Sequence, residues 1–100
     1  MPVTPIAGEV YQVAAGGTSV EVFPGGINGG IITNPVAAAD QGLGAAETLY
    51  VSPVGAADVH GNNITFALSP GQTWTAIPGQ TTPTTVNANS SGHKFTAVRY

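Results

Sequence analysis

Short stretches of apolar and alternating residues recur along the chain, and turn-forming residues close each of them. The stretches cover residues 10–13, 18–23, 30–33, 49–52, 64–68, 72–77, 84–88 and 94–100. Val, Ile, Thr and aromatic residues, which suit a pleated and half-buried surface, dominate them. Eight short strands with long cross-connections predict an all-β fold, a single small antiparallel β-sandwich of jelly-roll or Greek-key type.

The C-terminal third shows this pattern most clearly. Pro70-Gly71 and Pro78-Gly79 stand eight residues apart, and Gln-Thr follows each pair. Proline pre-sets φ at the first central position of a turn, and glycine accepts the positive φ that a type II turn needs next. Trp74 falls between the two turns at the centre of a strand, which favours a core position for its indole over a ligand-stacking one.

The N-terminal strands are predicted to form a hairpin. In residues 18–23, Val20 and Val22 share one face by alternation, and Phe23 falls on the other. Gly16-Gly17 separates this strand from residues 10–13 and supplies a plausible hairpin turn. Residues 1–9, with prolines at two positions, are predicted to be an extended arm outside a domain of residues 10–100.

Residues 35–48 form the longest segment without strand character. Asn34-Pro35 offers a helix N-cap and a first-turn proline, and residues 36–39 could complete one helical turn before Gly42 and Gly44 interrupt it. We expect a loop with at most a short helix, and a connection this long in a small β domain is often functional. Residues 54–63 fit either an edge strand or a turn region.

Charged residues are unusually scarce. Only 7% of the chain is charged, whereas about 25% is usual in a soluble domain. Either Thr, Ser, Asn and Gln solvate the surface, or neighbouring subunits cover much of it. We favour the second interpretation, because surfaces of Gly, Ala and Thr pack closely and hydrate weakly.

Charge and composition also exclude several classes of function. A net charge of −3 with two basic residues argues against nucleic-acid binding, which needs clustered Lys and Arg. The chain has no cysteine, no run of 18 apolar residues and no basic and apolar start. We therefore expect no disulfide, no membrane span and no secretory signal.

Candidate chemistry is sparse. Asp58 and His60 would share a strand face and could orient a general base or hold a metal, but no third ligand is near in sequence, which favours a solvated loop. His93 follows two serines, and a turn entering the last strand explains it better than a nucleophile–base pair. The sequence thus predicts no catalytic residue, no cofactor and no metal site, and the chain is expected not to be an enzyme.

Four phrases carry a resemblance to a known class of proteins. They are NPVAAADQG (residues 34–42), LYVSPVG (49–55), LSPGQTW (68–74) and GHKFTAVRY (92–100). Together they resemble small virion structural proteins of tailed bacteriophages, over roughly residues 27–100. The resemblance implies a capsid decoration (cement) protein or a tail or fibre component, and it brings no catalytic residues.

The expected function is therefore a non-enzymatic one in the virion. A decoration protein would bind the major capsid protein or other virion proteins in many copies, often as a trimer or another symmetric homo-oligomer, after synthesis in the host cytoplasm. The alternative is a tail or head-fibre component, or a glycan-binding module that uses Trp74 or exposed tyrosines in host attachment. The candidate subunit-contact residues are Pro2, Val3, Pro5, Ile6, Pro35, Val36, Leu43 and Tyr100.

Overall fold

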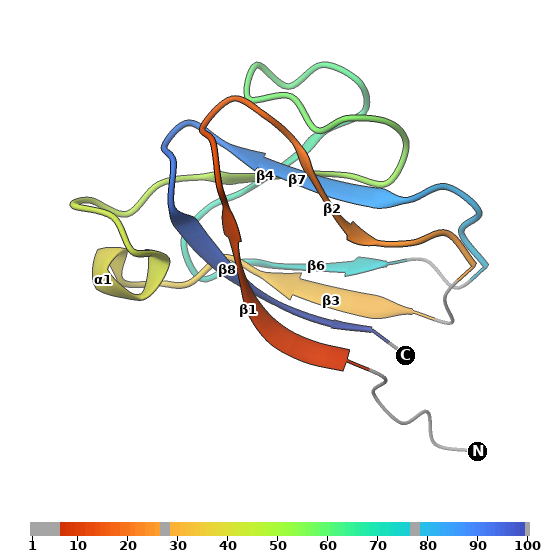
Figure 1. Ribbon diagram of the computed structural model, residues 1–100, viewed down its shortest axis with the longest axis horizontal. Coiled ribbons are helices and arrows are strands. Elements are labelled where there is room, and N and C mark those ends of the chain that lie inside the picture. The colour runs from red at the N-terminus through yellow and green to blue at the C-terminus, as the bar shows by residue number, and fades with distance from the viewer. Residues whose placement is uncertain (1–6, 27–28, 77–78, 100) are drawn as a thin grey trace.

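The computed structural model describes residues 7–26, 29–76 and 79–99 and contains two antiparallel sheets that lie face to face (Figure 1). The strands are β1 (Ala7–Val13), β2 (Val20–Phe23), β3 (Gly30–Thr33), β4 (Leu49–Ser52), β5 (Phe66–Leu68), β6 (Thr73–Ala76), β7 (Thr84–Ala88) and β8 (His93–Arg99). Sheet A has the order β1-β8-β3-β6, and sheet B has the order β2-β7-β4-β5. The predicted small antiparallel β-sandwich is confirmed, and each predicted strand has a counterpart.

The strand order is that of a jelly roll. β1 pairs with β8, β2 with β7, β3 with β6 and β4 with β5. The chain therefore resembles one long hairpin that has been rolled up, with successive strand pairs placed alternately in sheet A and sheet B. The sequence pattern left the choice between jelly roll and Greek key open, and the pairing decides it.

The predicted hairpin between the first two strands is wrong. β1 and β2 belong to different sheets, and the chain between them crosses from sheet A to sheet B. The N–H of Gly17 donates to the carbonyl of Ala88 at 2.8 Å, which attaches this crossing to β7. β1 instead pairs with β8 from Ala7 to Val13, so the strand also includes residues 7–9 of the predicted arm.

The predicted face of Phe23 is wrong as well, because β2 contains a bulge. Glu21 pairs with Thr85, but Phe23 pairs with Thr84, so the register shifts by one residue between them. The extra residue turns Phe23 onto the inner face, where its ring is buried. Gly30 makes room for it, since a Cβ at this glycine would lie 2.7 Å from the Phe23 ring.

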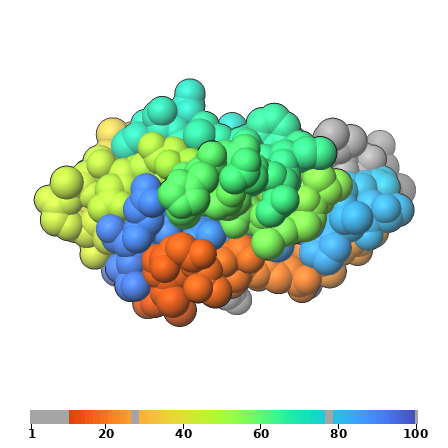
Figure 2. All heavy atoms as spheres, turned by 90° about the horizontal axis from the view of Figure 1, so that it is seen from above, coloured from red at the N-terminus to blue at the C-terminus, as the bar shows by residue number. Residues whose placement is uncertain are grey.

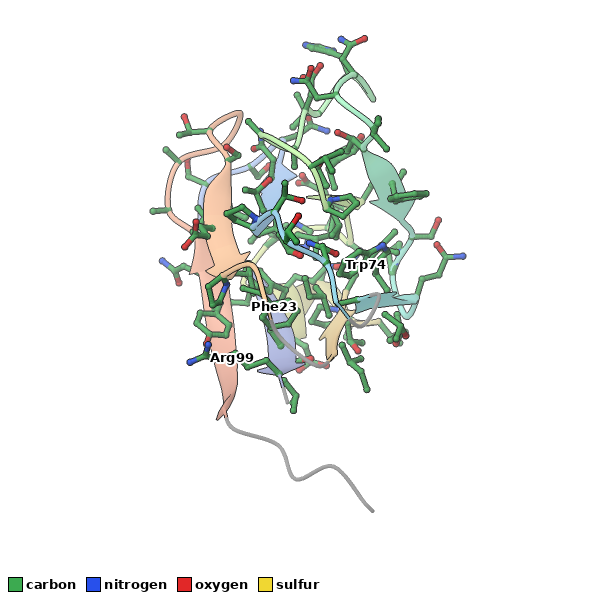
Figure 3. All side chains as sticks on the ribbon, turned by 90° about the vertical axis from the view of Figure 1, so that its right-hand side faces the viewer. Phe23, Trp74 and Arg99 are labelled. Carbon is green, nitrogen blue, oxygen red and sulfur yellow. The ribbon has the colours of Figure 1, made fainter. Side chains whose placement is uncertain are left out.

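The core lies between the two sheets and contains buried residues from all eight strands. The buried apolar residues of this core are Val13, Phe23, Ile32, Leu49, Val51, Leu68, Ala76, Val86, Ala88, Phe95 and Ala97. The Tyr11 ring stacks on Phe95 with centroids 5.6 Å apart. Trp74 is half-buried and packs against the core from edge strand β6, away from Phe23 (Figure 3). The predicted core position of the indole is met only in part, because the side chain packs against the core without being fully buried.

Two long loops complete the domain. The α1 loop (residues 34–48) contains one short helix, α1 (Ala38–Gln41), as the sequence predicted. Its predicted N-cap is wrong: the N-cap position is Ala37, without a side-chain cap. The capping loop (residues 53–65) has no strand, so of the two interpretations the edge strand is wrong. This loop spreads over the outer side of sheet B (green in Figures 1 and 2).

Candidate functional site

The α1 loop is attached to the sandwich by a buried polar network centred on Asn34. The Asn34 side-chain amide donates to the carbonyls of Glu47 (2.9 Å) and Leu68 (2.8 Å). Its Oδ1 lies 2.7 Å from Nε2 of Gln41 and 2.8 Å from Nε2 of His93. Both amides and the imidazole are fully buried. One asparagine thus joins β3, β5, β8 and both ends of the α1 loop.

The network also determines the tautomer of His93. Oδ1 of Asn34 can only accept, so Nε2 of His93 carries the proton. Nδ1 is then a bare lone pair, buried and without a partner among the described residues. Burial lowers the pKa of His93, and the carboxylate of Glu47 opposes this shift. The predicted turn into the last strand is confirmed: Ser91 and Gly92 form a turn, and His93 is the first residue of β8.

The capping loop is attached to sheet B through two side chains of β7, which bond to the loop backbone. Asn87, buried on β7, donates to the carbonyl of Ala57 at 2.9 Å, and Thr85 accepts from the N–H of Ala57 at 2.8 Å. Further along, Asp58 accepts from the N–H of His60 (3.2 Å) and from Asn62 (2.7 Å). These bonds lower the pKa of Asp58, with the backbone bond of His60 the largest cause.

Three exposed apolar side chains gather where the capping loop meets β5. The hydroxyl of Ser52 lies 3.0 Å from the carbonyl oxygen of Val54 and 2.9 Å from that of Asn63, which brings the two ends of the loop together. Phe66 pairs with Val51 on the inward side, but β5 is an edge strand and leaves its ring open. This apolar cluster consists of Val54 (38% exposed), Ile64 (66%) and Phe66 (49%).

The backbone beneath the apolar cluster is strained. Asn63 and Ile64 both have positive φ, 59° and 53°. Asparagine tolerates the left-handed region, but a β-branched residue there is an outlier that costs about 1–2 kcal/mol. Among the described residues, these two are the only ones other than glycine with positive φ. Strain of this kind persists at sites of function more often than elsewhere, and here it holds an apolar side chain in solvent.

The outer side of sheet A is a second surface. We call it the open face, and its residues are Ile31, Thr33, Thr73, Thr75, Thr96 and Val98. Thr96, Thr33 and Thr73 stand side by side on three strands. The hydroxyls of Thr33 and Thr73 are 3.0 Å apart. The whole patch is free of charge.

A hollow of about 490 Å³ lies between the open face and α1. We call it the groove, and its lining residues are Thr33, Pro35, Ala39, Asp40, Lys94 and Thr96. The stem of Lys94 runs along the end of α1, because a Cβ on Gly42 would lie 3.3 Å from Cε of Lys94. The groove therefore adds one ammonium and one carboxylate to an otherwise uncharged surface.

The predicted contact residues are distributed unevenly over these surfaces. Pro35 lines the groove. Val36 is 72% exposed and lies beside the turn at Gly71. Leu43 is half-buried, and its N–H donates to the carbonyl of Ala38, the first residue of α1. Pro2, Val3, Pro5, Ile6 and Tyr100 lie outside the described residues.

The titratable residues do not form a reaction centre in the described part of the chain. Asp58 and His60 are joined through a backbone N–H within one exposed turn, and His93 is bonded to Asn34. Across residues 7–26, 29–76 and 79–99, no three His, Asp or Glu side chains are grouped as metal ligands would be. The same residues include no helix with the length and hydrophobicity needed to cross a lipid bilayer.

No protein-family model matches the chain, and no curated protein or solved structure shows significant similarity to it. The residues that define the surfaces are therefore known from this structure alone. Sequence reasoning missed Asn34 as a network centre, Ile64 as a strained exposed residue, and the presence of both Asp40 and Lys94 in one groove. A signal existed only for Asn34, whose position before proline at a strand end suits a side chain that bonds to backbone.

Proposed function

We propose that this protein is a non-enzymatic structural component of a phage virion, a decoration protein that stabilises the head through many subunit contacts. The observation that carries the proposal is the apolar cluster, in which Ile64 is held in solvent on strained backbone. An exposed β-branched residue in the left-handed region costs stability, so a contact made by its side chain is a physical reason for keeping it.

The wider surface agrees with this role. The open face and the apolar cluster are uncharged, and small Thr-rich surfaces pack closely against neighbours. Each added copy that binds only the assembled shell stabilises it by mass action. Jelly rolls occur in viral capsid domains and also in lectins, so the fold by itself is only an analogy and the surfaces carry the argument.

The alternative is a tail or head-fibre module that recognises host glycans. Glycan stacking needs an aromatic face in water, and Trp74 is half-buried against the core. Tyr50 is half-buried on the outer side of sheet B. The half-buried positions of Trp74 and Tyr50 thus favour the decoration role over the glycan-binding one.

The variant Ile64→Asn tests the proposal, because it separates binding from stability. Asparagine accepts positive φ readily, so we expect the free energy of unfolding to rise by about 1 kcal/mol. We expect binding to empty shells or particles of the encoding phage to weaken at least tenfold in co-sedimentation. A stabilised protein that binds less well would identify Ile64 as a contact residue.

Val36→Asn is the matched control at an exposed valine of ordinary conformation, and it tests the predicted contact in the α1 loop. If wild-type protein does not co-sediment with any phage particle or shell, the decoration role is wrong. If it does, and Ile64→Asn binds as tightly as wild type, the shell is bound through another surface.

A further inference from the structure

The groove contains two opposite charges that do not neutralise each other. Lys94 and Asp40 are both exposed and line the same hollow. Among the described residues, neither has an oppositely charged partner within 4.0 Å. In a chain with only seven charged residues per hundred, such a cation and anion on one surface are a notable arrangement.

The remaining surface beside the groove is suited to a flat contact. Thr73 and Thr75 on β6 and Thr96 on β8 are exposed, and Ile31 and Val98 lie half-buried on β3 and β8. Sheet B has no equivalent, because the capping loop covers its outer side. The open face is thus the one broad sheet surface that the described residues leave uncovered.

We propose that a second copy of this chain docks on the open face about a two-fold axis, so that Lys94 of each copy pairs with Asp40 of the other. In a two-fold interface, a residue i that contacts j is matched by j contacting i. A surface with both signs of charge can therefore complement itself, and both ion pairs form at once. This dimer would be the building block of the assembly role proposed above, on which its biological use rests.

The size of the open face implies that the dimer contact also includes the groove. The open face lies on three strands about 4.8 Å apart, and a rise of about 3.3 Å per residue over about five residues gives a flat area of about 240 Å². A standard interface needs about 800 Å² per partner. The open face alone is too small for a stable dimer, so the contact has to extend over the groove and α1, where the two charges lie.

Charge reversal tests the dimer directly. The variants are Lys94→Glu, Asp40→Lys and the double variant, with sedimentation equilibrium over a concentration series as the measurement. We expect wild type to reach twice the 10.0 kDa chain mass. Each single variant should weaken the dimer at least tenfold through like-charge contacts, and the double variant should recover it because the pairs are reversed.

Glu21→Lys is the matched control, since it changes the net charge as Asp40→Lys does but lies on β2 of sheet B. Thr75→Arg places a long cationic side chain on edge strand β6 of the open face and should yield monomers. Circular dichroism verifies that each variant folds.

Several outcomes would overturn the dimer: a wild-type monomer at all concentrations, a trimer indifferent to the reversals, or an equal loss in Glu21→Lys. A folded double variant that does not recover association would overturn it too. Co-sedimentation with particles is measured in parallel, so that a monomer that still binds shells refutes the dimer and leaves the decoration role intact.

Discussion

The two long loops of this domain are attached by opposite means. The α1 loop is fixed from below by fully buried side chains, with Asn34 satisfied at both its amide nitrogen and its oxygen. The capping loop lies on the surface, held by Asn87, Thr85 and Ser52 of the strands and by exposed turn bonds within the loop. The two loops have similar lengths, but the α1 loop is anchored by side chains in the interior, whereas the capping loop lies on the outer side of sheet B.

The difference predicts that the two loops contribute differently to the stability of the domain. A buried network penalises every partial opening, because each broken bond leaves an unpaired polar group away from water. A surface loop opens at lower cost and can tolerate local strain, such as that at Ile64. We therefore expect changes in the first loop to affect the whole domain, and changes in the second to remain local.

The largest expected effect is that of Asn34→Ala. It leaves Nε2 of His93 unpaired and removes the side-chain bond to the carbonyl of Leu68. Gln41 and the carbonyl of Glu47 each lose one bond but remain bonded to each other. We expect a loss of roughly 3–5 kcal/mol in the free energy of unfolding, measured by urea denaturation. Asn62→Ala, at an exposed asparagine of the capping loop, is the control and should cost under about 1 kcal/mol. Similar losses in both variants would remove the contrast between the loops.

A smaller and local effect is expected for Asn87→Ala. The variant frees the carbonyl of Ala57 and detaches one end of the capping loop. We expect a loss of about 1–2 kcal/mol, with faster hydrogen exchange in residues 53–65 and unchanged exchange in the α1 loop. Uniformly faster exchange in both loops would mean that the capping loop is coupled to the rest of the domain as strongly as the α1 loop.

The smallest effect is a pH dependence near neutrality that comes from His93, the partner of Asn34. His93 has a lowered pKa in the folded state because it is buried, so the unfolded chain takes up its proton first as the pH falls. Stability from neutral His93 is complete above about pH 6.5 and is lost as the pH falls through the folded-state pKa. Glu47, the carboxylate that acts on His93, offsets part of this loss.

We therefore expect the Tm of wild type to fall between about pH 7 and pH 5, and that of His93→Gln to change less over this range. Glutamine keeps a side-chain donor for Asn34 but does not titrate. His60→Gln, at an exposed histidine, should follow wild type. Parallel Tm curves for wild type and His93→Gln would show that another group dominates.

The fold was largely predictable because turns and alternation are local signals. The Pro70-Gly71 turn is formed as predicted, with Gly71 at φ 89° and the N–H of Gln72 bonded to Ser69. Strand partners were not predictable, since pairing depends on residues far apart in sequence. The bulge at Phe23 shows the limit: one inserted residue reversed the predicted face of the largest side chain in β2.

The surfaces were predictable only in part. Val36 was chosen from sequence and is exposed. The groove was not foreseen, because Asp40 and Lys94 are distant in sequence and meet only when α1 packs beside β8. Polar residues were hardest: Asn34 and His93 look like loop residues, yet each is buried because the other is present.

The nesting of strand pairs has a consequence for how the protein is made. β8 is the common neighbour of β1 and β3, and the pairing of Ala7 with Arg99 joins the two ends of the described chain. β8 is synthesised after β1 and β3, so sheet A lacks its central ladder until β8 has left the ribosome. Such distant partners meet slowly. The nascent polypeptide must therefore wait, with β1 unpaired, until β8 has emerged, and a chaperone acting in that interval would raise the yield of folded protein.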